Sequence, residues 1–160
     1  MADILVRRDG GIGTLVFSNL EKHNAMTADM WEALPSRIAE LDRDPEVRVI
    51  VLSGDGDKAF VSGADVSQFG ANRSEPAAQR RYNEMVEAAY ASPARATKPV
   101  LAQIRGICFG GGLGLAAEQG RAHDRQHGVL VGRRRDRAAQ GNAAVNDEMA
   151  HSKTPSRSVD

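Results

Sequence analysis

Cysteine, net charge and long apolar runs are scarce in this sequence of 160 residues. The single cysteine, Cys108, excludes a disulfide within the chain and indicates a reducing compartment. Its place in an apolar stretch favours a buried structural thiol over a nucleophile. The 21 basic and 21 acidic residues cancel, so the overall charge suggests neither nucleic acid nor an anionic membrane as partner. No apolar run approaches the ~20 residues that cross a bilayer, and the N-terminus lacks a signal-like core. We therefore expect one soluble, cytoplasmic domain.

The first ninety residues alternate between strand and helix patterns. Apolar runs at 4–6 and 12–17 flank Asp9-Gly10-Gly11, which is typical of a hairpin turn. Thr27 is a suitable N-cap for a helix that contains Pro35 and whose apolar stripe is Met30, Trp31, Leu34, Ile38 and Leu41. An apolar strand is predicted at 47–52. A second helix is predicted from 77 to about 90, with an apolar face of Tyr82, Met85, Val86, Ala89 and Tyr90. Strand, helix and strand in this order predict an α/β fold with parallel pairing.

The stretch from Pro99 to Ala117 is the most informative. It begins as a buried strand, passes Gly106 and the triple glycine 110–112, and continues as a helix of small residues. Consecutive glycines at a helix start leave backbone N–H groups open to an oxyanion or a phosphate. The same glycines could instead serve only to let a helix and a strand approach closely. This stretch alone favours neither interpretation.

Four segments occur in a specific order: NLEKHNAM at 19–26, VIVLSG at 49–54, KAFVSGAD at 58–65 and KPVLAQIRGICFGGG at 98–112. Together they resemble the enoyl-CoA hydratase/isomerase (crotonase) family, over residues 1 to about 117. The resemblance implies an α/β spiral of β-β-α units, here truncated after its central helix. It also implies an enzyme of fatty acid metabolism, a lyase or isomerase, that stabilises the enolate of an acyl-CoA thioester.

The resemblance also implies site residues. Two backbone N–H groups would hold the thioester oxygen, those of Ala64 and Gly111. The residues expected along coenzyme A or beside the thioester are Lys22, Asn24, Ala25, Ser62, Gly63, Ala64, Asp65, Gly110 and Gly111. Lys22 and Lys58 are candidate phosphate neighbours, although a surface lysine is more often only a solvated charge. No metal and no cofactor is implied beyond the coenzyme A of the substrate, and the full-length family implies a homotrimer or hexamer.

Two departures from the family pattern bear on activity. The family's hydratases carry a glutamate two residues after the triple glycine, where this chain has Gly114. Their second glutamate follows in a Phe-Gly-x-Pro-Glu-like segment that has no counterpart here. The alternative is therefore an inactive acyl-CoA-binding or inert fragment. A dinucleotide-binding or phosphate-binding domain is disfavoured, because residues 110–114 lack the G-x-G-x-x-G spacing and a Walker lysine.

Residues 118–160 differ in character from the rest of the chain. They contain no Phe, Tyr, Trp, Ile or Cys, and they include the basic run 132–137. Such a composition predicts a disordered tail. Three interpretations remain: a nucleic-acid patch, which the absence of aromatics disfavours; a metal site at His123, His127 and His151, which the glycine-rich flanks disfavour; or translation out of frame from a GC-rich gene.

Overall fold

The computed structural model describes residues 2–68, 76–117 and 122–124. Their main feature is a five-stranded sheet in the order β1-β2-β3-β5-β7. The first pair, β1 (Asp3–Asp9) and β2 (Ile12–Ser18), is antiparallel, which confirms the predicted hairpin. Strands β3 (Val49–Gly54), β5 (Val100–Ile104) and β7 (Ala122–Asp124) continue the sheet in parallel. The predicted α/β class is therefore confirmed.

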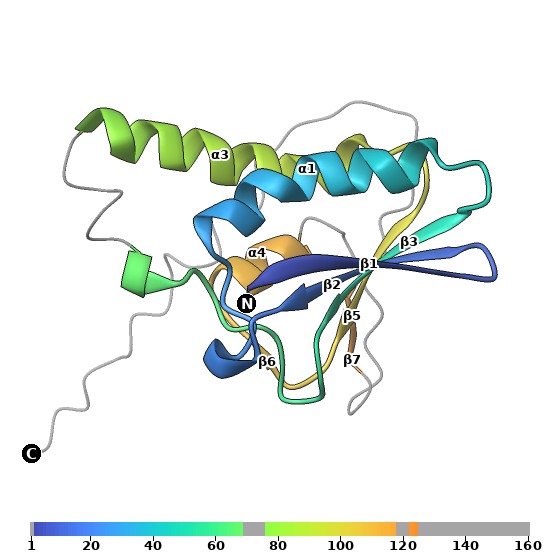
Figure 1. Cartoon of the computed structure of the whole chain (residues 1–160), viewed down its shortest axis with the longest axis horizontal. Helices are drawn as coiled ribbons and strands as arrows, with labels where there is room; N and C mark the ends of the chain where they lie inside the picture. The colour runs from blue at the N-terminus through green and yellow to red at the C-terminus, as the bar shows by residue number, and fades with distance from the viewer. Residues whose placement is uncertain (1, 69–75, 118–121, 125–160) are drawn as a thin grey trace, which may run out of the picture.

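Helices α1 (Ala28–Arg43) and α3 (Pro76–Arg95) pack together across one face of the sheet (Figure 1). Thr27 caps α1 as predicted, because its hydroxyl accepts a hydrogen bond from the Met30 amide at 3.2 Å. The buried side chains of α1 are the five of the predicted apolar stripe, and Pro35 lies within the helix. Helix α3 runs five residues past its predicted end at Tyr90. Its apolar face therefore packs on the core along a greater length than the sequence indicated.

A second, two-stranded sheet carries the glycine-rich segments. Strand β4 (Ala59–Val61) pairs in parallel with β6 (Ile107–Cys108), and the helix α4 (Gly111–Ala117) follows β6. The sequence predicted a loop over 58–66. The structure corrects this at the three residues of β4, which are all buried, and places the short helix η2 (Val66–Gln68) after them. A further short helix, η1 (Leu20–Lys22), follows β2.

The tail is described only at β7. The sequence predicts disorder from Glu118 onward; within that range the structure describes residues 122–124, which pair in parallel with 102–104 of β5. Pairing along the free edge of β5 uses backbone groups, so it does not need the apolar side chains that this segment lacks. The remaining tail, with its basic run and with His127 and His151, lies outside the described residues.

No helix in the described ranges is long and apolar enough to cross a membrane.

Candidate functional site

Two loops of small residues lie against each other where β4 and β6 end. The Phe109 amide donates to the Val61 carbonyl at 3.1 Å, which extends the contact between the two strands. A Cβ built on Gly110 would lie 3.7 Å from the Cα of Gly63. The segments 62–65 and 109–111, which are more than 40 residues apart in sequence, therefore form one site.

The backbone around Ala64 is fixed by the segment that follows η1. Met26 forms an isolated parallel bridge with Ala64, in which the Met26 amide donates to the Gly63 carbonyl and the Asp65 amide donates to the Met26 carbonyl, both at 2.8 Å. Successive N–H groups of extended backbone point in opposite directions. The Ala64 N–H therefore points away from Met26. In the described part of the chain, no acceptor binds the N–H of Ala64 or of Gly111.

Ala64 and Gly111 line one cavity of about 390 Å³. Its other walls come from α1 and α3, namely Trp31, Tyr82, Asn83, Val86, Glu87 and Tyr90. The structure thus brings together the two residues that the family resemblance implied for an oxyanion hole. The α3 residues were not identified as site residues from the sequence. The only feature of the sequence that could have identified Tyr82 and Tyr90 as site residues is that each carries a hydroxyl on an otherwise apolar helix face.

The ring of Tyr90 occupies the space beside the glycines of α4. A Cβ at Gly114 would lie 2.8 Å from Tyr90 Cε1 and 3.1 Å from its hydroxyl oxygen. The Tyr90 ring also makes an edge contact with Trp31, with centroids 5.3 Å apart. Burial and the neighbouring Tyr82 raise the pKa of Tyr90 above its usual value near 10. The phenol of Tyr90, which lines the cavity, is therefore protonated, and it lies beside position 114, which has no side chain.

The ammonium of Lys22 connects the two segments that the bridge between Met26 and Ala64 pairs. Its Nζ lies 2.7 Å from Asp65 Oδ2 and 2.7 Å from Ser67 Oγ. The hydrogen bond from Lys22 has the largest effect on the pKa of Asp65, followed by that from Ser67, and both hold this pKa below its usual range. The Ser62 hydroxyl donates to the Lys22 carbonyl at 3.0 Å. Lys22 is thus held by protein groups at the edge of the site, although its side chain, like that of Lys58, is exposed.

Asn24 and Ala25 are both buried, and the Ala25 carbonyl accepts a hydrogen bond from the Asn19 side chain at 2.8 Å. The Asn24 side chain is 1 % exposed, and its amide donates to the carbonyls of Asp55 and Ala59 at 2.9 and 2.8 Å. Its oxygen accepts from the Asn19 amide at 3.1 Å. Asn24 has φ of +59°, a left-handed conformation that asparagine tolerates better than most residues. With its polar groups used inside the protein, Asn24 fixes the course of the 22–26 segment.

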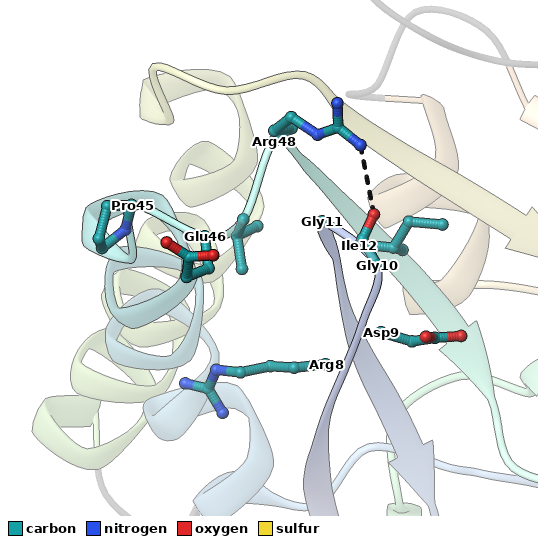
Figure 2. Close-up of a pocket in the computed structure, with 9 residues that line it drawn as sticks. Arg8, Asp9, Gly10, Gly11, Ile12, Pro45, Glu46 and Arg48 are labelled. Atoms are coloured by element: carbon teal, nitrogen blue, oxygen red, sulfur yellow. Dashed lines mark hydrogen bonds between the residues drawn. The ribbon is translucent and has the colours of Figure 1, made fainter.

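Two other features carry no site. Cys108 is half-buried, and burial raises the pKa of its thiol, in line with a structural role. Within the described ranges, no three His, Cys, Asp or Glu side chains are grouped to hold a metal. A hollow of about 500 Å³ lies at the β1–β2 turn, at the other end of β2 from the site (Figure 2). Its arginines have protein partners: Arg8 pairs with Glu40 and Asp44, and Arg48 donates to the Gly10 carbonyl.

The chain is similar to proteins of one family. The sequence pattern described as enoyl-CoA hydratase/isomerase matches residues 7–118. A peroxisomal Delta(3,5)-Delta(2,4)-dienoyl-CoA isomerase of Arabidopsis thaliana is 34% identical, over 67% of this chain and 42% of the relative. A short-chain-enoyl-CoA hydratase of Clostridium acetobutylicum is 25% identical, over 71% of this chain and 43% of the relative. The crystal structure of an enoyl-CoA hydratase/carnithine racemase from Magnetospirillum magneticum superposes with a TM-score of 0.68 at 32% identity, covering 72% of this chain and 43% of that one. The chain thus spans less than half the length of these relatives.

Proposed function

Because the chain belongs to the enoyl-CoA hydratase/isomerase family, we propose that it binds an acyl-CoA thioester and stabilises its enolate at the backbone N–H groups of Ala64 and Gly111. The relatives' names include both an isomerase and a hydratase, so the proposal concerns the step of enolate formation rather than one final product. The acyl-CoA is the substrate, and the proposed chemistry requires no metal or further cofactor.

One observation carries the proposal. Ala64 and Gly111 come from separate loops, line the same cavity, and have N–H groups without an acceptor among the described residues. A negative charge that develops on a thioester oxygen there would be held by two fixed donors. Removing one such donor typically costs a factor of ~10²–10³ in rate.

The donor at Gly111 can be tested without adding atoms to the site. Any side chain there would meet Trp31, because a Cβ would lie 2.8 Å from its Cζ2. We therefore suggest replacing Gly111 by glycolic acid, which exchanges the N–H for an oxygen and adds no bulk. The full chain should bind butyryl-CoA more tightly than coenzyme A in calorimetry, and the replacement should reduce that preference. Equal affinity for both ligands in the unmodified chain would contradict the proposal.

The second candidate is binding without turnover. Gly114 offers no acid–base group, and the ring of Tyr90 leaves no room for a longer side chain at that position. A chain that binds butyryl-CoA through both N–H groups but neither hydrates crotonyl-CoA nor exchanges its α-hydrogens would be such a binding protein. Assembly as a trimer or hexamer, also proposed from the family, is tested by sedimentation of the full chain.

A further inference from the structure

The hydroxyl of Tyr90 lies beside the glycines that carry the site. A Cβ built on Gly111 would lie 3.4 Å from this oxygen, and one built on Gly114 would lie 3.1 Å from it. Since a Cα–Cβ bond is ~1.5 Å long, the phenol oxygen lies within about 5 Å of both Cα atoms. Resting on the function proposed above, we propose that the Tyr90 hydroxyl exchanges a proton with the α-carbon of an acyl-CoA thioester whose oxygen is held by Ala64 and Gly111.

The reach of this hydroxyl fits the proposed ligand position. A thioester oxygen bound by an N–H group lies ~2.7–3.1 Å from the nitrogen. The α-carbon is only two bonds away from that oxygen. A hydroxyl about 5 Å from the Gly111 Cα can therefore lie within the ~3 Å that proton transfer requires. Tyr90, Ala64 and Gly111 line the same cavity, so a ligand that fills it would contact all three residues.

The surroundings of Tyr90 hold its ring in place. Trp31 packs against the ring edge, and the ring covers Gly114 closely enough that a Cβ there would lie 2.8 Å from Cε1. The neighbouring Ala89 is fully buried, which anchors this turn of α3 in the core. None of the described residues forms a hydrogen bond with the Tyr90 hydroxyl, so its proton is available to a ligand.

The proton transfer balances without another reactant. In the direction of enolate formation, the phenolate takes the α-proton: the C–H bond breaks, an O–H bond forms, and the electron pair moves onto the thioester oxygen. In reverse, the phenol returns a proton to the enolate carbon. Between the two steps the phenol exchanges its proton with water.

The ionisation of Tyr90 sets the pH dependence. The raised pKa keeps the hydroxyl protonated at neutral pH, so proton abstraction should accelerate as the pH rises towards that pKa. The other titratable groups that line the cavity are Tyr82 and Glu87, both on α3. Helices α1 and α4 and the Ala64 loop contribute only Trp31, Gly111 and Ala64 to its walls.

The test is incorporation of solvent deuterium at the α-carbon of butyryl-CoA by the full chain, followed by mass spectrometry. Tyr90→Phe keeps the ring and removes only the oxygen. It should lower the exchange rate by a factor of ~10²–10⁴ and leave butyryl-CoA affinity unchanged. Ser36→Ala is the control, because it removes a hydroxyl from the exposed side of α1, outside the cavity. It should leave the rate within a few-fold of the unmodified chain.

A second variant covers the case in which Tyr90→Phe fails to fold. A fluorinated tyrosine at position 90 lowers the phenol pKa, and it should shift the pH profile of exchange to lower pH. An unshifted profile, or equal exchange by Tyr90→Phe, would overturn the assignment of Tyr90 and leave the proposed function standing. Binding of butyryl-CoA without any exchange would also overturn it. Absence of binding by the unmodified chain would overturn both proposals.

Discussion

The close approach of α4 to β4 makes Gly112 the glycine of α4 that is least able to accept a side chain. A Cβ at Gly112 would lie 2.3 Å from the Val61 carbonyl oxygen and 2.8 Å from the Val61 Cβ. The first partner is backbone in a buried strand, so the helix must move by about 1 Å to restore ordinary contact. Overpacking of this kind costs about 1–3 kcal/mol. We therefore expect Gly112→Ala to be destabilised and to displace the neighbouring Gly111 N–H.

Gly114→Ala is the matched control for this prediction. Both glycines lie in α4, so the helix propensity gained on changing Gly to Ala, about 1 kcal/mol, is the same for both. At Gly114 the new methyl group meets the ring of Tyr90 at 2.8 Å, a longer approach than the 2.3 Å at Gly112 and one to a side chain at the wall of a cavity rather than to the backbone of a buried strand, so a smaller shift relieves it. With a urea m-value of ~1–3 kcal/mol/M, Gly112→Ala should unfold at a midpoint about 1 M lower than Gly114→Ala. Equal midpoints, or a more stable Gly112→Ala, would refute the reasoning from close approach.

Three further predictions concern the segment between η1 and α1 and the Asp65 carboxylate that pairs with Lys22. Asn24→Ala should lower the free energy of unfolding by about 2–4 kcal/mol, because the buried Ala59 carbonyl and the partly buried Asp55 carbonyl lose their donor. Urea unfolding measures this, and a loss below about 1 kcal/mol would contradict it. Thr27→Ala should cost about 0.5–2 kcal/mol through loss of the α1 cap, while Thr27→Ser should retain most of the stability. Asp65→Asn should cost no more than about 1 kcal/mol at pH 7, because Lys22 is partly exposed. The folded pKa of Asp65 lies below its unfolded value, so this stabilisation is present above about pH 4 and disappears as the pH falls through the folded pKa. A difference between Asp65→Asn and the unmodified chain that persists in acid would contradict the assignment.

Features encoded by neighbouring residues could be predicted from the sequence. The turn at Gly10 and Gly11 specifies the β1–β2 hairpin, because both residues adopt positive φ, which glycine allows without strain. Thr27 and the apolar spacing that follows it specify the start and the buried face of α1. These signals act within a few residues, so they do not depend on the rest of the fold.

Features that depend on distant segments could not be predicted. The pairing of β4 with β6 joins residues almost 50 positions apart, and neither strand exceeds three residues. The carbonyls that accept hydrogen bonds from the Asn24 side chain lie 31 and 35 residues further along the chain, so the local sequence does not reveal these contacts. Tyr90 has the spacing of a core residue, and only the approach of α3 to α4 places its ring beside Gly114 at the wall of a cavity. The predicted placement of Ala64 and Gly111 came from the family resemblance; the residues alone indicated only two small-residue loops.

In the proposed function, the N–H groups of Ala64 and Gly111 polarise a thioester carbonyl. Isotope-edited infrared spectroscopy of butyryl-CoA labelled with ¹³C at the carbonyl measures this directly, because hydrogen bonds from fixed donors lower the stretching frequency. With the full chain at saturating concentration, the band should lie at lower frequency than in water and should return towards the water value when Gly111 is replaced by glycolic acid. A bound ligand whose carbonyl absorbs at the water frequency would contradict the account.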